Sequence, residues 1–167
     1  MKYLYYTYVD AKTRASCIEA PPSNGPDNPA VPGLLFGFAL ESRYPTPHPI
    51  MYGACPDDAE TNLPGVLGVI SEAAYQQALA DEMTARRSRI VVSKRQARLA
   101  LLQVGLLDNV EAAISAIPDE TQRRQAQISW EYADEIRRLD PWIAVLGGAL
   151  NLDDAALDEL FTLAGTL

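Results

Sequence analysis

Few side chains in this sequence of 167 residues have types and spacing that could support chemistry. The single histidine, His48, lies between Pro47 and Pro49, without a nearby second metal ligand or a partner nucleophile. Histidine catalysis and histidine metal sites both need such partners, so we expect no catalytic or metal-binding role for His48. The densest carboxylate run, residues 57–62, offers oxygen ligands for calcium, but it lacks EF-hand spacing and the required glycine. An exposed turn is the interpretation that we favour for it.

The two cysteines, Cys17 and Cys55, allow two interpretations. They could form a disulfide between neighbouring strands, or they could be two free, partly buried thiols. The tyrosine-rich residues 3–8 are too polar and too short for the apolar part of a secretory leader, which favours the free thiols. No Walker, Rossmann, CxxC, HExxH or GxSxG pattern occurs. The sequence thus predicts no catalytic residue, no cofactor and no metal, and a protein that is not an enzyme.

Charge and the distribution of apolar residues each argue against one class of partner. The chain has 14 basic and 22 acidic residues, a net charge of −8, and acids and bases alternate along its expected helices. An acidic chain without a basic stripe is a poor binder of phosphate backbones, so we expect no nucleic-acid partner. No apolar run approaches the roughly 20 residues of a membrane helix, so we expect a soluble protein without a membrane partner.

The expected helices and strands fall into two parts of the chain, with a boundary near residue 88. In residues 1–88, β-rich runs are followed by one helix, from residue 72 to about residue 86. Strands that precede a helix, rather than alternate with helices, favour an antiparallel sheet, so this part is predicted to be a small α+β module with proline-rich loops. The expected strands cover residues 2–9, 17–19, 34–40, 50–54 and 66–70, and the proline-rich loops cover residues 21–29 and 44–49. Residues 34–40 are continuously apolar, and we expect that strand to be buried on both faces.

The first expected strand has an unusual density of tyrosines. Tyr3 and Tyr5 share one face with Thr7, while Leu4, Tyr6 and Tyr8 share the other. One face would lie in the core and the other would be open to a partner, since tyrosine is common at interfaces. Simple packing of both faces explains the pattern equally well. The candidate interaction residues, two of them from the second proline-rich loop, are Tyr3, Tyr5, Tyr6, Tyr8, Tyr44 and His48.

Residues 89–167 are predicted to form an all-α bundle of about five short helices. Ser93 and Gln96 have the spacing of a capping box, which residues 108–111 repeat. Gly105 is placed to end the first of these helices, and Asp153 is placed to cap the last. The longest helix is expected over residues 120–139, with Trp130 in the core.

Several stretches of this bundle resemble a helical segment found in proteins of tailed phages and prophages, whose genes commonly lie near the tail tip and tail fibres. The similarity covers residue 93 to the C-terminus, and residues 56–72 are more weakly similar to a stretch that precedes such segments. No functional residue can be transferred, because the family has no catalytic motif that matches here. The stretches that carry the resemblance are residues 95–102, 105–107, 110–114, 130–133, 136–138 and 157–161.

The resemblance implies a non-enzymatic accessory protein of the phage tail, made in the host bacterial cytoplasm and incorporated into the virion. Its partner would be a tail-fibre or baseplate protein, and it would be present in several copies, including as a homo-oligomer. Proline-rich loops and a tyrosine-rich strand suit such an interaction protein. Two alternatives stay open: a tail-fibre assembly chaperone, and a phage-encoded inhibitor of a host protein.

Overall fold

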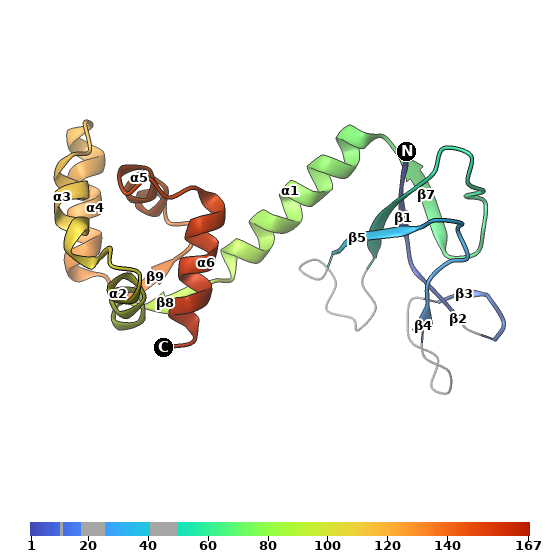
Figure 1. Ribbon diagram of the computed structural model, residues 1–167, viewed down its shortest axis with the longest axis horizontal. Helices are drawn as coiled ribbons and strands as arrows, with labels where there is room; N and C mark the ends of the chain where they lie inside the picture. The colour runs from blue at the N-terminus through green and yellow to red at the C-terminus, as the bar shows by residue number, and fades with distance from the viewer. Residues whose placement is uncertain (11, 18–25, 41–49) are drawn as a thin grey trace. The chain divides into compact units, whose positions relative to one another are not determined.

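The chain forms two compact units, Met1–Ala85 and Arg86–Leu167. The computed structural model describes residues 1–10, 12–17, 26–40 and 50–167 (Figure 1). The first unit contains a four-stranded antiparallel sheet, and the second is mostly helical, so the expected α+β class is confirmed. No helix in the described residues is both long and apolar enough to cross a membrane.

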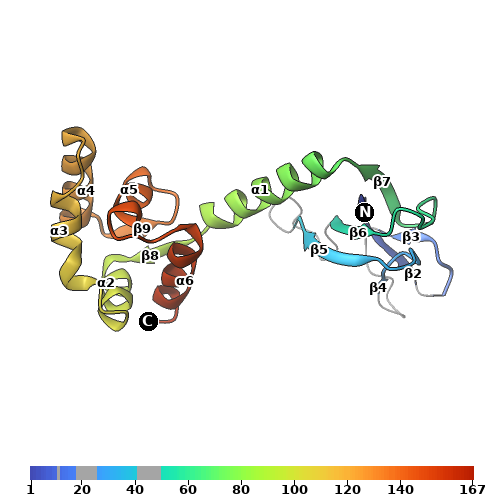
Figure 2. The same ribbon diagram turned by 45° about the horizontal axis from the view of Figure 1, so that its top comes forward.

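The main sheet places the tyrosine-rich strand at its centre. The strand order is β5-β6-β1-β7, with β1 Lys2–Tyr6, β5 Leu35–Ala39, β6 Met51–Cys55 and β7 Val66–Ile70 (β1 is labelled in Figure 1 and β6 in Figure 2). Tyr5 is directly opposite Tyr52 of β6 and Gly68 of β7, so these positions share one face. Leu4 and Tyr6 face the other way and are fully buried in the core of this unit.

The expected strand over residues 2–9 is broken at Thr7. Strand β1 ends at Tyr6, although the Thr7 backbone N–H still donates to the Gly65 carbonyl at 2.8 Å, in the register of the preceding Tyr6–Val66 pair. The chain then enters a second, three-stranded sheet of order β3-β2-β4, made of β2 Tyr8–Asp10, β3 Ser16–Cys17 and β4 Pro26–Asp27. A single run of β-forming residues therefore supplies strands to two sheets.

Strand β5 is not buried on both faces, contrary to expectation. Leu35 and Phe36 are 61% and 59% exposed, because β5 is an edge strand and its register with β6 shifts between Phe36 and Phe38. Only its second half is buried, at Phe38 and Ala39. The following helix, α1 Glu72–Ser88, was expected, and the Ser71 Oγ accepts from the Ala74 N–H at its start.

The second unit contains more than helices. Its elements are β8 Val91–Ser93, α2 Lys94–Gln103, the 3₁₀-helix Leu107–Asn109, α3 Val110–Ser115, α4 Glu120–Tyr132, β9 Glu135–Arg137, α5 Pro141–Ala149 and α6 Asp154–Gly165. The expected helix over residues 120–139 ends at Tyr132, where Ala133 turns to an extended conformation. Ile136 then pairs with Val92 in a two-stranded antiparallel sheet, β8-β9. The prediction of an all-α bundle was wrong in this respect.

The capping signals were correct where they are purely local. Ser93 and Gln96 form the full capping box, Asp153 caps α6, and Gly105 has the positive φ of 71° expected at a helix end. The predicted second box over residues 108–111 does not form. Asp108 lies inside the 3₁₀-helix that leads directly into α3, and Asn109, at the N-cap of α3, makes no side-chain capping hydrogen bond.

A partly buried ion-pair network joins α6 to Arg138, the residue that follows β9. Arg138 is only 3% exposed, and its guanidinium donates to Asp158 Oδ1 at 2.7 Å and Asp154 Oδ1 at 2.8 Å. Arg87 shares both aspartates, with its closest contact at 2.7 Å to Asp158 Oδ2. The hydrogen bond from Arg138 is the main reason that the pKa of Asp154 lies below its usual range. All four groups have partners inside this unit, so the network is structural.

Candidate interaction surfaces

An aromatic cluster covers one face of the main sheet in the first unit. Phe38 and Tyr52 stack with ring centroids 4.7 Å apart and ring planes 4° apart. Tyr75, from the first turns of α1, contacts the Phe38 ring edge-on at 5.4 Å and the Tyr3 ring at 4.9 Å. Tyr5 extends the cluster, with its ring centroid 6.2 Å from that of Tyr52. We call these five side chains the aromatic face: Tyr3, Tyr5, Phe38, Tyr52 and Tyr75.

Glycines on the neighbouring strands make room for the tyrosine rings. A Cβ atom at Gly68 would lie 2.7 Å from the Tyr5 ring, and one at Gly37 would lie 2.0 Å from the Tyr75 hydroxyl oxygen. The Tyr5 ring and the Tyr75 hydroxyl therefore occupy space that a side chain at Gly68 or Gly37 would fill. All four tyrosines of the aromatic face are half-buried, while Phe38, which stacks on Tyr52, is buried, at 7% exposed. A rigid patch with apolar rings and polar tips is the kind of surface that proteins use for contact.

Tyr3 is further held by the helix that follows the sheet. Its hydroxyl hydrogen-bonds to Glu72 in the first turn of α1, and this bond is the main reason that the pKa of Tyr3 lies above its usual value. The bond favours the neutral phenol over the phenolate.

The six candidate residues from the sequence fall into three groups. Tyr3 and Tyr5 belong to the aromatic face. Tyr6 has no exposed surface and is part of the core, so it is removed from the candidate surface; its place in β1 points it away from Tyr5. Tyr8 is half-buried in β2 and packs against the same core. Tyr44 and His48 lie outside the described residues.

Sequence reasoning missed three members of the aromatic face. Phe38, Tyr52 and Tyr75 come from three separate elements, and only the strand register and the start of α1 bring them to Tyr5 and Tyr3.

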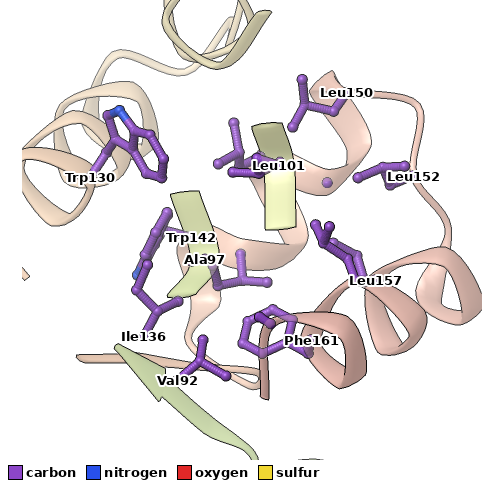
Figure 3. A pocket seen from close by; sticks show the side chains of 15 residues that line it. Val92, Ala97, Leu101, Trp130, Ile136, Trp142, Leu150, Leu152, Leu157 and Phe161 are labelled. Atoms are coloured by element: carbon purple, nitrogen blue, oxygen red, sulfur yellow. The ribbon is translucent and has the colours of Figure 1, made fainter. Parts of the chain in front are cut away.

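The second unit encloses an apolar cavity of about 40 Å³. Figure 3 shows its lining converging from α2, α5 and α6, with Leu101, Trp142 and Phe161 among the side chains. No polar atom lines it. It is far smaller than the roughly 150 Å³ of a cavity that admits benzene, so it is a packing space in the core rather than a ligand site.

A different surface of this unit has a charged groove, which the sequence analysis did not identify. A hollow of about 380 Å³ lies along α2 and the 3₁₀-helix, lined by three cations and three leucines: Lys94, Arg95, Arg98, Leu99, Leu102 and Leu107. We call it the basic groove. Its sequence signal is the spacing of Arg95, Arg98 and Leu102 on one side of a helix.

The carboxylate run at residues 57–62 forms an exposed turn. Asp57 is 79% exposed on its side chain and pairs with the N-terminal ammonium of Met1 at 3.0 Å. Within the residues that the structure describes, no three His, Cys, Asp or Glu side chains come together in a way that could hold a metal ion. Cys55 is a free, fully buried thiol, and the side chain of Cys17 lies outside what the structure describes.

Comparisons with protein-family models, with curated proteins and with solved structures found no match to this chain.

Proposed function

We propose that this protein is a non-enzymatic accessory protein of a phage tail, which binds a tail-fibre or baseplate protein through its aromatic face. The observation that carries the binding role is the rigid cluster of half-buried tyrosines on an antiparallel sheet. The tail assignment is supported by the resemblance of the C-terminal stretch to segments of tailed-phage proteins.

The physical chemistry of the aromatic face supports a protein partner. Each tyrosine has only two side-chain torsions to fix, so it contributes contact area at a small entropic cost. Tyr5 and Tyr52 already have their rings ordered by stacking and by the backbone of Gly68, which lowers the cost of binding further. The exposed edge residues Leu35 and Phe36 of β5 provide more apolar surface in the same unit.

Mass spectrometry of purified phage particles tests this proposal. We expect the wild-type protein to be present beside the fibre or baseplate protein at a small, symmetric copy number. The double variant Tyr5→Ser with Tyr52→Ser removes two rings of the aromatic face and should be lost from particles, at least tenfold by peptide intensity.

Tyr132→Ser is the matched control, since Tyr132 is a 75%-exposed tyrosine of the other unit. It should leave incorporation unchanged, and circular dichroism should show that all variants are folded. Complete absence of the wild-type protein from particles would overturn the structural role, and equal incorporation of both variants would overturn the assignment to the aromatic face.

One observation favours the assembly chaperone as a second candidate. Strand β7 is an edge strand without charge or proline, and Leu67 and Val69 are 44% and 51% exposed. Such an edge is a template for an incoming strand, as a folding fibre would provide. A chaperone would raise the yield of soluble fibre trimers on co-expression and be absent from finished particles, and Val69→Lys would reduce that rescue.

A further inference from the structure

The basic groove of the second unit combines positive charge with apolar surface in a way that the proposed function does not use. We propose that it binds an acidic protein segment that presents leucine-like side chains between its carboxylates. Three cations and three leucines line the same open surface hollow. This proposal rests on a separate unit from the aromatic face and does not depend on it.

The cations of the basic groove are available to a partner. In the described part of the chain, neither Arg95 nor Arg98 forms an ion pair, whereas Arg87, Arg124 and Arg138 do. The Lys94 ammonium donates to the Glu131 backbone carbonyl, which anchors its side chain but leaves its charge uncompensated. Each guanidinium can therefore offer a bidentate contact to a carboxylate.

Arg98 is also held in position before any partner arrives. Its guanidinium carbon lies 4.9 Å from the centre of the Trp130 ring, a cation–π contact. Trp130 is itself 6% exposed and packed in the core, so Arg98 contacts a ring that is held in place. A pre-positioned cation loses less entropy on binding than a freely rotating one.

The leucines identify the class of partner. Leu102 is 58% exposed on α2, and Leu99 and Leu107 are half-buried beside it. A phosphate backbone would use the three cations but leave this apolar surface in water. A segment with both acidic and apolar side chains satisfies both halves of the lining.

The adjoining surface gives the groove a direction. A second hollow, of about 370 Å³, shares Arg98 and Leu107 with the basic groove but is bordered by Asp108 and Glu111. A bound segment must therefore place its carboxylates over Lys94, Arg95 and Arg98 rather than over Asp108 and Glu111, because like charges across an interface cost affinity.

Fluorescence anisotropy of the full chain with labelled probes tests the proposal. The probes are a short glutamate–leucine peptide, the same peptide with serine for leucine, the same peptide with lysine for glutamate, a single-stranded oligonucleotide and phosphatidylglycerol vesicles. We expect only the glutamate–leucine peptide to bind, and Arg95→Glu to weaken it about tenfold, the effect of losing one charged contact.

Arg95→Glu should not destabilise α2, because this helix has no acidic residue in its first turn and a helix start favours negative charge. The matched control is Arg137→Glu, which makes the same charge change at an exposed position of β9 and should leave binding unchanged. If Arg137→Glu weakened peptide binding as much as Arg95→Glu, the loss would come from the change in net charge alone, and the proposal would be overturned. Equal binding of the serine peptide, tighter binding of the oligonucleotide or vesicles, or no binding of any probe would also overturn it.

Discussion

Tyr6 has a side-chain oxygen that is fully buried and without a hydrogen-bond partner in the described part of the chain. A buried hydroxyl that has given up its water without a replacement costs about 1–3 kcal/mol. Burial also raises the pKa of Tyr6 to about 12, with smaller contributions from Tyr8 and Tyr75. The core thus accommodates the ring of Tyr6 but not its polar tip.

Tyr6→Phe should therefore leave the free energy of unfolding unchanged or raise it by up to about 1 kcal/mol near neutral pH. The effect should grow in alkali. An unfolded tyrosine loses its proton near pH 10, while folded Tyr6 keeps it until about 12, so the wild type loses stability between these values as the unfolded state ionises. Urea unfolding at about pH 8 and about pH 11 measures both effects.

Tyr5→Phe is the control for this measurement, since Tyr5 lies on the half-buried face of the same strand. The alkaline loss of stability should be smaller in Tyr6→Phe than in the wild type, and of wild-type size in Tyr5→Phe. A clear loss of stability in Tyr6→Phe near neutral pH would show that the hydroxyl has a partner after all.

At the scale of elements, α5 and α6 approach each other at a glycine. A Cβ atom at Gly147 would lie 2.7 Å from Leu157 Cδ1 of α6, whereas nothing lies within 4 Å of a Cβ at Gly148. Both glycines are inside α5, where alanine is favoured by about 1 kcal/mol on helix propensity alone. Alanine substitutions at the two positions therefore separate the effect of helix propensity on stability from the effect of packing.

We expect Gly148→Ala to raise the free energy of unfolding by about 1 kcal/mol, and Gly147→Ala to lie about 1–3 kcal/mol below it, because the added methyl group crowds buried Leu157. Urea denaturation followed by tryptophan fluorescence measures the difference. Equal stabilisation by the two substitutions would mean that Leu157 moves freely into the neighbouring cavity.

Elements with local signals could be predicted from the sequence, and elements that depend on distant partners could not. The cap at Ser93, the positive φ at Gly105 and the start of α6 at Asp153 involve residues only a few positions apart. Strand β9 depends on pairing Ile136 with Val92, so the helical pattern before it masked the change from period 3.6 to period 2. The aromatic face and the basic groove were missed for the same reason, since their members meet only in the folded unit.

At the scale of the whole molecule, the chain has two separate hydrophobic cores. One contains Leu4, Tyr6 and Met51, and the other contains Trp130, Trp142 and Leu157. Sequence composition placed the division near residue 88, and contacts within the structure divide the chain between Ala85 and Arg86. The aromatic face belongs to the first unit and the basic groove to the second.

Both tryptophans of the protein, Trp130 and Trp142, lie in the second core, so tryptophan fluorescence reports on that unit alone, while circular dichroism reports on both. Leu157→Ala should lower the midpoint of the fluorescence transition, since removing a buried leucine costs about 2–5 kcal/mol. Leu4→Ala removes an equally buried leucine of the first core and should shift only part of the dichroism transition, with the fluorescence midpoint unchanged. Cooperative units open with their own free energies, so a parallel shift of the fluorescence midpoint in Leu4→Ala would show instead that the two cores unfold as one.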